Sequence, residues 1–171
     1  MSENEVKFVA RDYDELETLL SPYGWFDIDQ GYLTPECRVR RIIYPNGGRQ
    51  HYFTFKQRLA NGENLEIEPT ILEAYFIEAW QHTKERLRKR RITVEHGNLK
   101  WDIDFYRWQH GRYFVVAEVE MPSQMRRPEE ILPALVPRLV YEVPRDDGRF
   151  AARRLADEEH AKTVAQQLGL I

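Results

Sequence analysis

The feature that most constrains the fold is a repeated alternation of apolar and charged residues. The stretch YFVVAEVEMP (residues 113–122) shows it, because Glu118 and Glu120 alternate with Val119 and other apolar residues. Successive side chains of a β-strand point to opposite faces, so this segment is expected to have one charged face and one apolar face. Taken alone, such a strand is typical of a sheet with one face in water.

Six further segments place charged or polar residues two apart opposite apolar neighbours. Their members are Glu3, Glu5 and Lys7; Arg38 and Arg40; Thr54 and Lys56; Glu66 and Glu68; Lys89, Arg91 and Thr93; and Asp102 and Asp104. We therefore predict strands over residues 3–9, 36–44, 50–58, 63–68, 87–95, 99–106, 113–121 and 138–144. Asn46-Gly47 and Asn61-Gly62 predict tight turns between strands, because both residue types tolerate positive φ.

Four short helices are predicted between and after the strands. Capping boxes at Asp12 and at Thr70 predict two helix starts, the first helix ending near Leu20. The second is expected to bury an apolar face made of Leu72, Tyr75, Phe76, Ala79 and Trp80. Pro128 predicts a short third helix, and residues 157–168, followed by Gly169, predict the last.

Length and composition favour one soluble domain over residues 1–171. The 171-residue chain is 42% hydrophobic and 31% charged, which suits one globular core. A net charge of −3 gives no electrostatic case for nucleic acid or an anionic membrane as partner. No apolar run approaches the roughly 20 residues that span a bilayer, and the single cysteine, Cys37, forms no internal disulfide. A cytoplasmic location is expected.

Two arrangements of the strands fit the alternation. Either the apolar faces form an inner core and the charges face water, or the apolar faces lie outside under helices and the charges line a bore. The sorting of charges into short acidic and basic pairs favours the second, since a phosphate chain requires several Arg and Lys donors and Mg²⁺ or Mn²⁺ requires carboxylate oxygens. We predict an α+β, mainly β fold: an eight-stranded antiparallel closed barrel, or tunnel, with helices packed on the outside.

At these residues the chain resembles the CYTH family, the triphosphate tunnel metalloenzymes. The resemblance begins at an E-x-E-x-K motif at Glu3, Glu5 and Lys7. The later motifs follow in the family order, and the chain also has the QGYL sequence (residues 30–33) of bacterial members. They are R-x-R at Arg38 and Arg40, T-x-K at Thr54 and Lys56, E-x-E at Glu66 and Glu68, K-x-R at Lys89 and Arg91, an Asp at Asp104, and E-x-E at Glu118 and Glu120.

The resemblance implies a divalent-metal-dependent triphosphatase, as monomer or homodimer, acting on inorganic tripolyphosphate or on a nucleoside or thiamine triphosphate. It implies that Glu66 and Glu68 are tunnel-wall carboxylates that either orient the basic residues or contact a second metal. Lys7 follows the acidic pair in the same strand, so we predict that it orients the attacking water or acts as the base. The implied metal ligands for Mg²⁺ or Mn²⁺ are Glu3, Glu5, Asp104, Glu118 and Glu120. The implied triphosphate-binding residues are Lys7, Arg38, Arg40, Lys56, Lys89 and Arg91.

One segment departs from the family. Where members often read R-Y-S-N-x-x-L-A, this chain has RFAARRLA, with Ala151 and Ala152 at the Ser and Asn positions. Two other functions stay open on the sequence. One is a class IV type adenylate cyclase that makes cyclic AMP from ATP, and the other is a non-catalytic module that binds polyphosphate or nucleotide.

Overall fold

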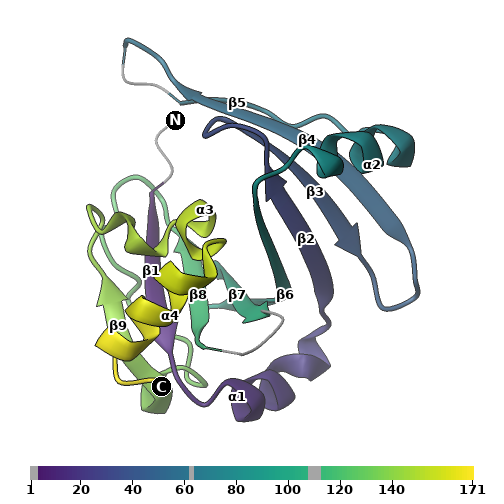
Figure 1. The fold of residues 1–171 in the computed structure, drawn as a ribbon. Coiled ribbons are helices and arrows are strands. Elements are labelled where there is room, and N and C mark those ends of the chain that lie inside the picture. Colours follow the sequence, from purple (N-terminus) through teal and green to yellow (C-terminus); the bar gives the residue numbers. More distant parts are fainter. Residues whose placement is uncertain (1–3, 62–63, 108–112) are drawn as a thin grey trace.

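The computed structural model describes residues 4–61, 64–107 and 113–171 and consists mainly of one antiparallel sheet. Figure 1 shows this sheet as a strongly curved layer with helices on both of its faces. The strands are β1 (Glu5–Ala10), β2 (Phe26–Tyr32), β3 (Cys37–Ile43), β4 (Arg49–Arg58), β5 (Asn64–Ile67), β6 (Glu85–His96), β7 (Leu99–Arg107), β8 (Val115–Glu120) and β9 (Leu139–Val143). The helices are α1 (Tyr13–Leu20), α2 (Glu73–Gln81), α3 (Ala152–Leu155) and α4 (Glu158–Gln167), with 3₁₀ turns η1 (Ser21–Tyr23), η2 (Val136–Arg138) and η3 (Gly148–Phe150).

The mainly β prediction is confirmed, but the closed eight-stranded barrel is wrong. The strand order is β5-β4-β3-β2-β6-β7-β8-β1-β9, with β5 and β9 as the two edges of an open sheet. The edges come near each other, because Asn64 of β5 and Val143 of β9 line one cavity of about 340 Å³. With only four residues, β5 is too short to seal the gap, and the segment after β9 lies in it.

The ninth strand is β2, which the alternation did not reveal. Its sequence, FDIDQGY, places Asp27 and Asp29 opposite the cavity-facing Gln30 and Tyr32. Aspartate is depleted in strands, and two of them in one short segment weaken the signal. Asp29 is nonetheless 2% exposed and accepts hydrogen bonds from Arg41 at 2.6 Å and from Arg88 at 2.6 Å. Arginines of the two neighbouring strands thus compensate the buried carboxylate of Asp29, which allows this segment to form a strand.

The apolar strand faces form a core on the convex side of the sheet, as the second arrangement predicts. Trp101 and Phe8 are fully buried there, with ring centroids 5.7 Å apart. Leu16 of α1 and Leu135, just before η2, close over them. This packing leaves the charged faces of the same strands on the concave side.

The prediction that all helices pack outside is wrong for the C-terminal pair. Phe150, Leu155 and Val164 form a second core with Val9 and Val116, which share a strand face with Lys7 and Glu118. Figure 1 shows α3 and α4 lying within the curve of the sheet. One end of the concave face is therefore apolar and filled, while the other end is charged.

The predicted helix boundaries are confirmed in part. The helix predicted from Asp12 is α1, although Asp12 has φ 59° and makes no side-chain cap. The Thr70 capping box is wrong, because α2 begins at Glu73 after Leu72 and Thr70 forms a bridge with Tyr52. In the last helix, the Asp157 side chain accepts a hydrogen bond from the His160 amide at 3.0 Å.

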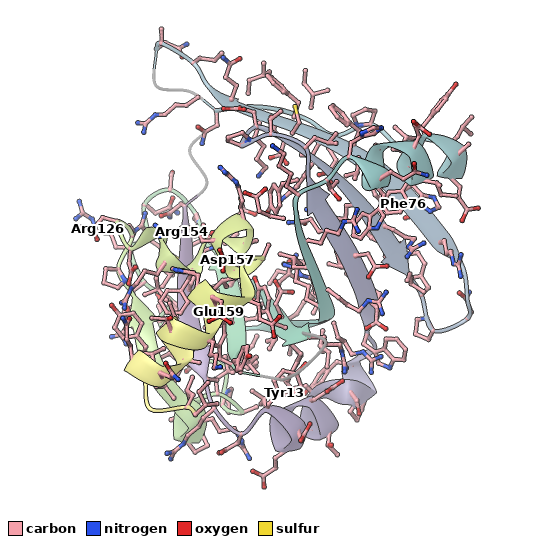
Figure 2. The ribbon with its side chains drawn as sticks, in the orientation of Figure 1. Tyr13, Phe76, Arg126, Arg154, Asp157 and Glu159 are labelled. Carbon is pink, nitrogen blue, oxygen red and sulfur yellow. The ribbon has the colours of Figure 1, made fainter. Side chains whose placement is uncertain are left out.

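Two further helix predictions fail. No helix begins at Pro128 within the described part of the chain, and the η2 turn follows instead. The predicted apolar face of α2 is largely exposed to solvent, since the exposed fractions of Leu72 and Tyr75 are 66% and 65%. Only Phe76 is buried in α2, and it lies between the helix and the sheet, 5.0 Å from the His51 ring (Figure 2).

None of the helices in the described residues is long and apolar enough to cross a lipid bilayer.

Close packing at Gly31 leads to a stability prediction. A Cβ on Gly31 would lie 2.8 Å from Cγ2 and Oγ1 of Thr83. Thr83 cannot turn away freely, because its hydroxyl donates to the Trp80 carbonyl at 2.8 Å and accepts from Arg86 at 2.8 Å. We expect Gly31→Ala to destabilise the fold by about 1–3 kcal/mol. Urea unfolding measures this, and Thr83→Ser should recover part of the loss; full stability of Gly31→Ala alone would contradict it.

Candidate functional site

A cavity of about 380 Å³ opens on the charged end of the concave face. Its walls come from β1, β2, β3, β4, β6 and β8 and from the segment 151–153 before and within α3. Eight of the residues predicted for the site line it: Glu5, Lys7, Arg38, Arg40, Lys56, Lys89, Arg91 and Glu118. Strands far apart in the sequence therefore bring the predicted basic and acidic side chains into one space.

The acidic side of the cavity is organised around Lys7. Its ammonium lies 2.8 Å from a Glu5 carboxylate oxygen and 2.7 Å from one of Glu118. Burial would lower the pKa of Lys7, but the charges of Glu118 and Glu5 outweigh it and raise that pKa. Lys7 is therefore a charged hydrogen-bond donor at neutral pH.

The closed-barrel prediction also implies that Glu118 and Glu120 lie across the bore from Glu3 and Glu5, and this is wrong for Glu5. Strands β1 and β8 are neighbours, with Glu5 opposite Glu120 and Lys7 opposite Glu118 in register. Glu120 is exposed, lies in register with Glu5 and does not line the cavity. Glu3 lies outside the described residues.

Two carboxylates of the cavity, Glu5 and Glu118, are candidate metal ligands. Among residues 4–61, 64–107 and 113–171, no three His, Cys, Asp or Glu side chains come together closely enough to hold a metal ion. Glu5 and Glu118 are nevertheless held near one nitrogen atom. Mg²⁺ is commonly bound by one or two carboxylates together with substrate phosphates, so this pair of hard oxygen donors fits a divalent ion that is shared with a phosphate ligand.

Asp104 is more deeply buried than that acidic pair and holds two basic residues. It is fully buried, and its oxygens accept hydrogen bonds from Arg91 at 2.6 and 2.7 Å and a short one from Lys89. Arg91 also donates hydrogen bonds to Asp102 at 2.9 Å and to Glu118 at 3.4 Å. Burial would raise the pKa of Asp104, but the charges of Arg91 and Lys89 outweigh it and lower that pKa to about 2.

Two glutamates, Glu66 in β5 and Glu68 just after it, contact basic residues of the cavity. Glu68 accepts a hydrogen bond from Thr54 at 2.5 Å and lies 3.5 Å from both Arg38 and Arg40. Glu66 lies 3.1 Å from the Lys56 ammonium. Each of the two glutamates therefore contacts cations of the cavity, and the tunnel-wall role implied for them stays a prediction.

Sequence reasoning missed Gln30 and Tyr32 as parts of the site, although both lie in the QGYL segment. Arginine can only donate, so the 3.3 Å bond from Arg40 Nε identifies the Gln30 oxygen. The Gln30 amide nitrogen then donates to the Tyr32 hydroxyl at 2.6 Å. The Tyr32 oxygen accepts this bond, so the hydroxyl proton of Tyr32 is not used by Gln30. Tyr32 also lines the cavity.

The segment that departs from the CYTH pattern also reaches the cavity. Ala151 and Ala152 line its wall, so they contribute methyl groups where hydroxyl and amide groups were expected. Arg153 lines the same wall and lies 3.4 Å from Glu85. Figure 2 shows the neighbouring Arg154 at the same end of the C-terminal helices.

Comparison with known proteins supports the fold but does not identify an activity. No family model matches the chain, and no curated protein matches it by sequence. The solved structure of the hypothetical protein NE1496 matches with a TM-score of 0.58 and 22% identity, over 91% of this chain and 97% of that one. At this identity the likeness shows the fold alone.

Two other solved structures are more distant. A conserved hypothetical protein from Pyrococcus furiosus matches with a TM-score of 0.47 and 17% identity, over 99% of this chain and 92% of that one. A protein described as a candidate adenylate cyclase, bh2851 from Bacillus halodurans, matches with a TM-score of 0.48 and 15% identity, over 71% of this chain and 81% of that one.

Proposed function

We propose that this chain is a divalent-metal-dependent triphosphatase that hydrolyses a small triphosphate in the charged cavity. The supporting observation is that six basic side chains and two carboxylates from five different strands line a single cavity. Arg and Lys donors suit the many oxygens of a phosphate chain, and the carboxylates suit Mg²⁺ or Mn²⁺. The motif order of the CYTH family supports the same reading.

The residues suggest a division of work. Glu5, Glu118 and Glu120 would hold the metal, with Glu3 as a further expected ligand; the bound metal would neutralise phosphate oxygens. Arg38, Arg40, Lys56, Lys89 and Arg91 would stabilise charge on the transferring phosphoryl group and on the leaving group.

Lys7 has a more specific role in this proposal. As a charged donor between Glu5 and Glu118, it orients the attacking water or a phosphate oxygen, and does not act as a base. Tyr32 adds a neutral donor, since its hydroxyl proton is not used by Gln30. Such fixed donors in a sheltered cavity stabilise developing charge most effectively.

The decisive experiment is to incubate the protein with tripolyphosphate, thiamine triphosphate or ATP, with Mg²⁺ or Mn²⁺. Release of phosphate is expected, and EDTA should abolish it. Cyclic AMP and pyrophosphate from ATP would replace the proposal with the cyclase alternative. Binding of tripolyphosphate without any turnover would support the non-catalytic module instead.

The buried Lys89 predicts a pH dependence of binding. Burial lowers the pKa of Lys89 to about 8, against the opposing charge of Asp104. Lys89 therefore loses its positive charge as the pH rises through this value, and tripolyphosphate affinity should fall several-fold between pH 7 and pH 9. Calorimetric titration at constant ionic strength measures the change. In Lys89→Arg the fall should be smaller because a guanidinium stays charged, so an equal fall in both proteins would contradict the assignment.

A further inference from the structure

The buried carboxylate of Asp104, which contacts the cavity residues Lys89 and Arg91, supports one more inference. This inference rests on the proposed function, which identifies the ligand of the cavity as a triphosphate. We propose that Asp104 is a positioning residue that holds the Lys89 ammonium and the Arg91 guanidinium in place for the triphosphate, and that it does not bind the divalent metal. This departs from the metal-ligand role that the CYTH resemblance implies for Asp104.

The contacts of Asp104 are already taken up by cations. Oδ1 accepts from Arg91 Nε at 2.6 Å, and Oδ2 accepts from Arg91 Nη2 at 2.7 Å and from the Lys89 ammonium. A carboxylate has about four lone-pair positions, so at most one is left. Asp104 is also 0% exposed and does not line the cavity.

A metal ion cannot reach this carboxylate without breaking those bonds. Metal–oxygen distances for Mg²⁺ are about 2.0–2.1 Å, so the ion would have to replace Arg91 or Lys89 at the Asp104 oxygens. Displacing a partner from a buried ion pair leaves an uncompensated charge and is strongly unfavourable. Glu118 differs in both respects, since its side chain is 19% exposed and it lines the cavity.

The same bonds determine how the two cations are presented to a ligand. The two parallel bonds to Asp104 fix the plane of the Arg91 guanidinium, and Asp102 and Glu118 hold its outer nitrogens. Lys89 is held between Asp104 and the ring of Tyr106, 5.5 Å from its centroid. Ordering these flexible side chains before binding removes an entropic cost that the triphosphate would otherwise meet.

Metal titration separates the two roles of Asp104. We would titrate Mn²⁺ into wild type, Asp104→Asn and Glu118→Gln without any triphosphate, following bound Mn²⁺ by electron paramagnetic resonance. The expected Mn²⁺ dissociation constant of Asp104→Asn is within about twofold of wild type, whereas that of Glu118→Gln should rise about tenfold or more, because a charged ligand is lost. A similar loss in both variants would overturn the proposal.

The positioning role has two signals of its own, and the first of them needs no turnover. In wild type, the Nε–H of Arg91 should give a protected resonance in ¹⁵N NMR spectra, because it is bonded to Asp104. Asp104→Asn should weaken this protection and raise the KM for tripolyphosphate about tenfold. An unchanged Arg91 resonance together with an unchanged KM would refute the positioning role. Wild type that bound neither Mn²⁺ nor triphosphate would instead refute the proposed function, while the Arg91 resonance would still test the contact.

A second variant tests metal affinity in case Asp104→Asn alone fails to fold. Asp104→Asn removes one buried negative charge and leaves two cations, which destabilises the fold. The double variant Asp104→Asn/Lys89→Met removes one charge of each sign and keeps Arg91 as the remaining cation. Its Mn²⁺ affinity should also stay within about twofold of wild type, and a tenfold loss would count against the proposal.

Discussion

Glu118→Gln is expected to reduce metal-dependent turnover of tripolyphosphate by about 10²- to 10³-fold. The substitution keeps the shape of the side chain and removes the negative charge that lies 2.7 Å from Lys7. Loss of that charge weakens metal binding and leaves Lys7 with Glu5 as its nearest carboxylate. Phosphate release at a fixed Mg²⁺ concentration, just sufficient to saturate the wild type, measures the effect, and the double variant Glu118→Gln/Glu120→Gln should have no metal-dependent activity.

The matched control for this prediction is Glu95→Gln. Glu95 is an exposed residue of β6 outside the cavity lining, so its loss should leave both turnover and melting temperature unchanged. Circular dichroism should show a folded protein in all variants. Full activity of the folded double variant would remove Glu118 and Glu120 from the site, and unfolding of that variant would indicate a structural role.

Arg91→Met is expected to destabilise the fold by about 3–5 kcal/mol. Arg91 makes two of the three bonds to the fully buried Asp104, so its removal leaves a buried carboxylate held by Lys89 alone. Urea unfolding at pH 7 measures the loss. The exposed Arg58, at the end of β4, offers the control, and Arg58→Met should change stability by less than about 0.5 kcal/mol.

Acid titration provides a second readout of the same contact. Because the pKa of Asp104 is lowered to about 2 from 3.8, its ionised form stabilises the fold fully above pH 4, and this contribution is lost as the pH falls through about 2. In Arg91→Met the pKa of Asp104 should rise, so unfolding should begin at a higher pH. Identical acid-unfolding curves for the variant and wild type would show that Arg91 does not stabilise the Asp104 carboxylate.

The alternation of strand residues predicted most of the sheet and the composition of the cavity. Lys7, Arg38 and Glu118 meet in one space because each occupies the charged face of its strand, and strand parity is a local property. Strand parity does not show, however, whether two strands are neighbours in the sheet or lie opposite each other across the cavity. The positions of Glu5 and Glu118 on adjacent strands follow from the strand order, which depends on pairing over long distances in the chain.

Other features depend on partners that no local pattern contains. The two aspartates of β2 argue against a strand until Arg41 and Arg88 are placed beside Asp29. The open edge follows from the shortness of β5 and from the C-terminal segment that lies beside it. The partners of Asp104 are likewise invisible in the motif, since Asp102 and Asp104 share one face and only the structure places one against Arg91 and Lys89.

The pairing of β1 with β8 also determines when the cavity can form during synthesis. Lys7 and Glu118 are separated by 111 positions in the chain, and β1 remains without either of its neighbours until β8 and β9 have been made. Contacts of such long range form late and slow folding. A nascent chain therefore carries its basic strands well before it can assemble the pocket, and Phe150, Leu155 and Val164 must still dock to complete it. The cavity is therefore complete only after the segment that contains these three residues has been made.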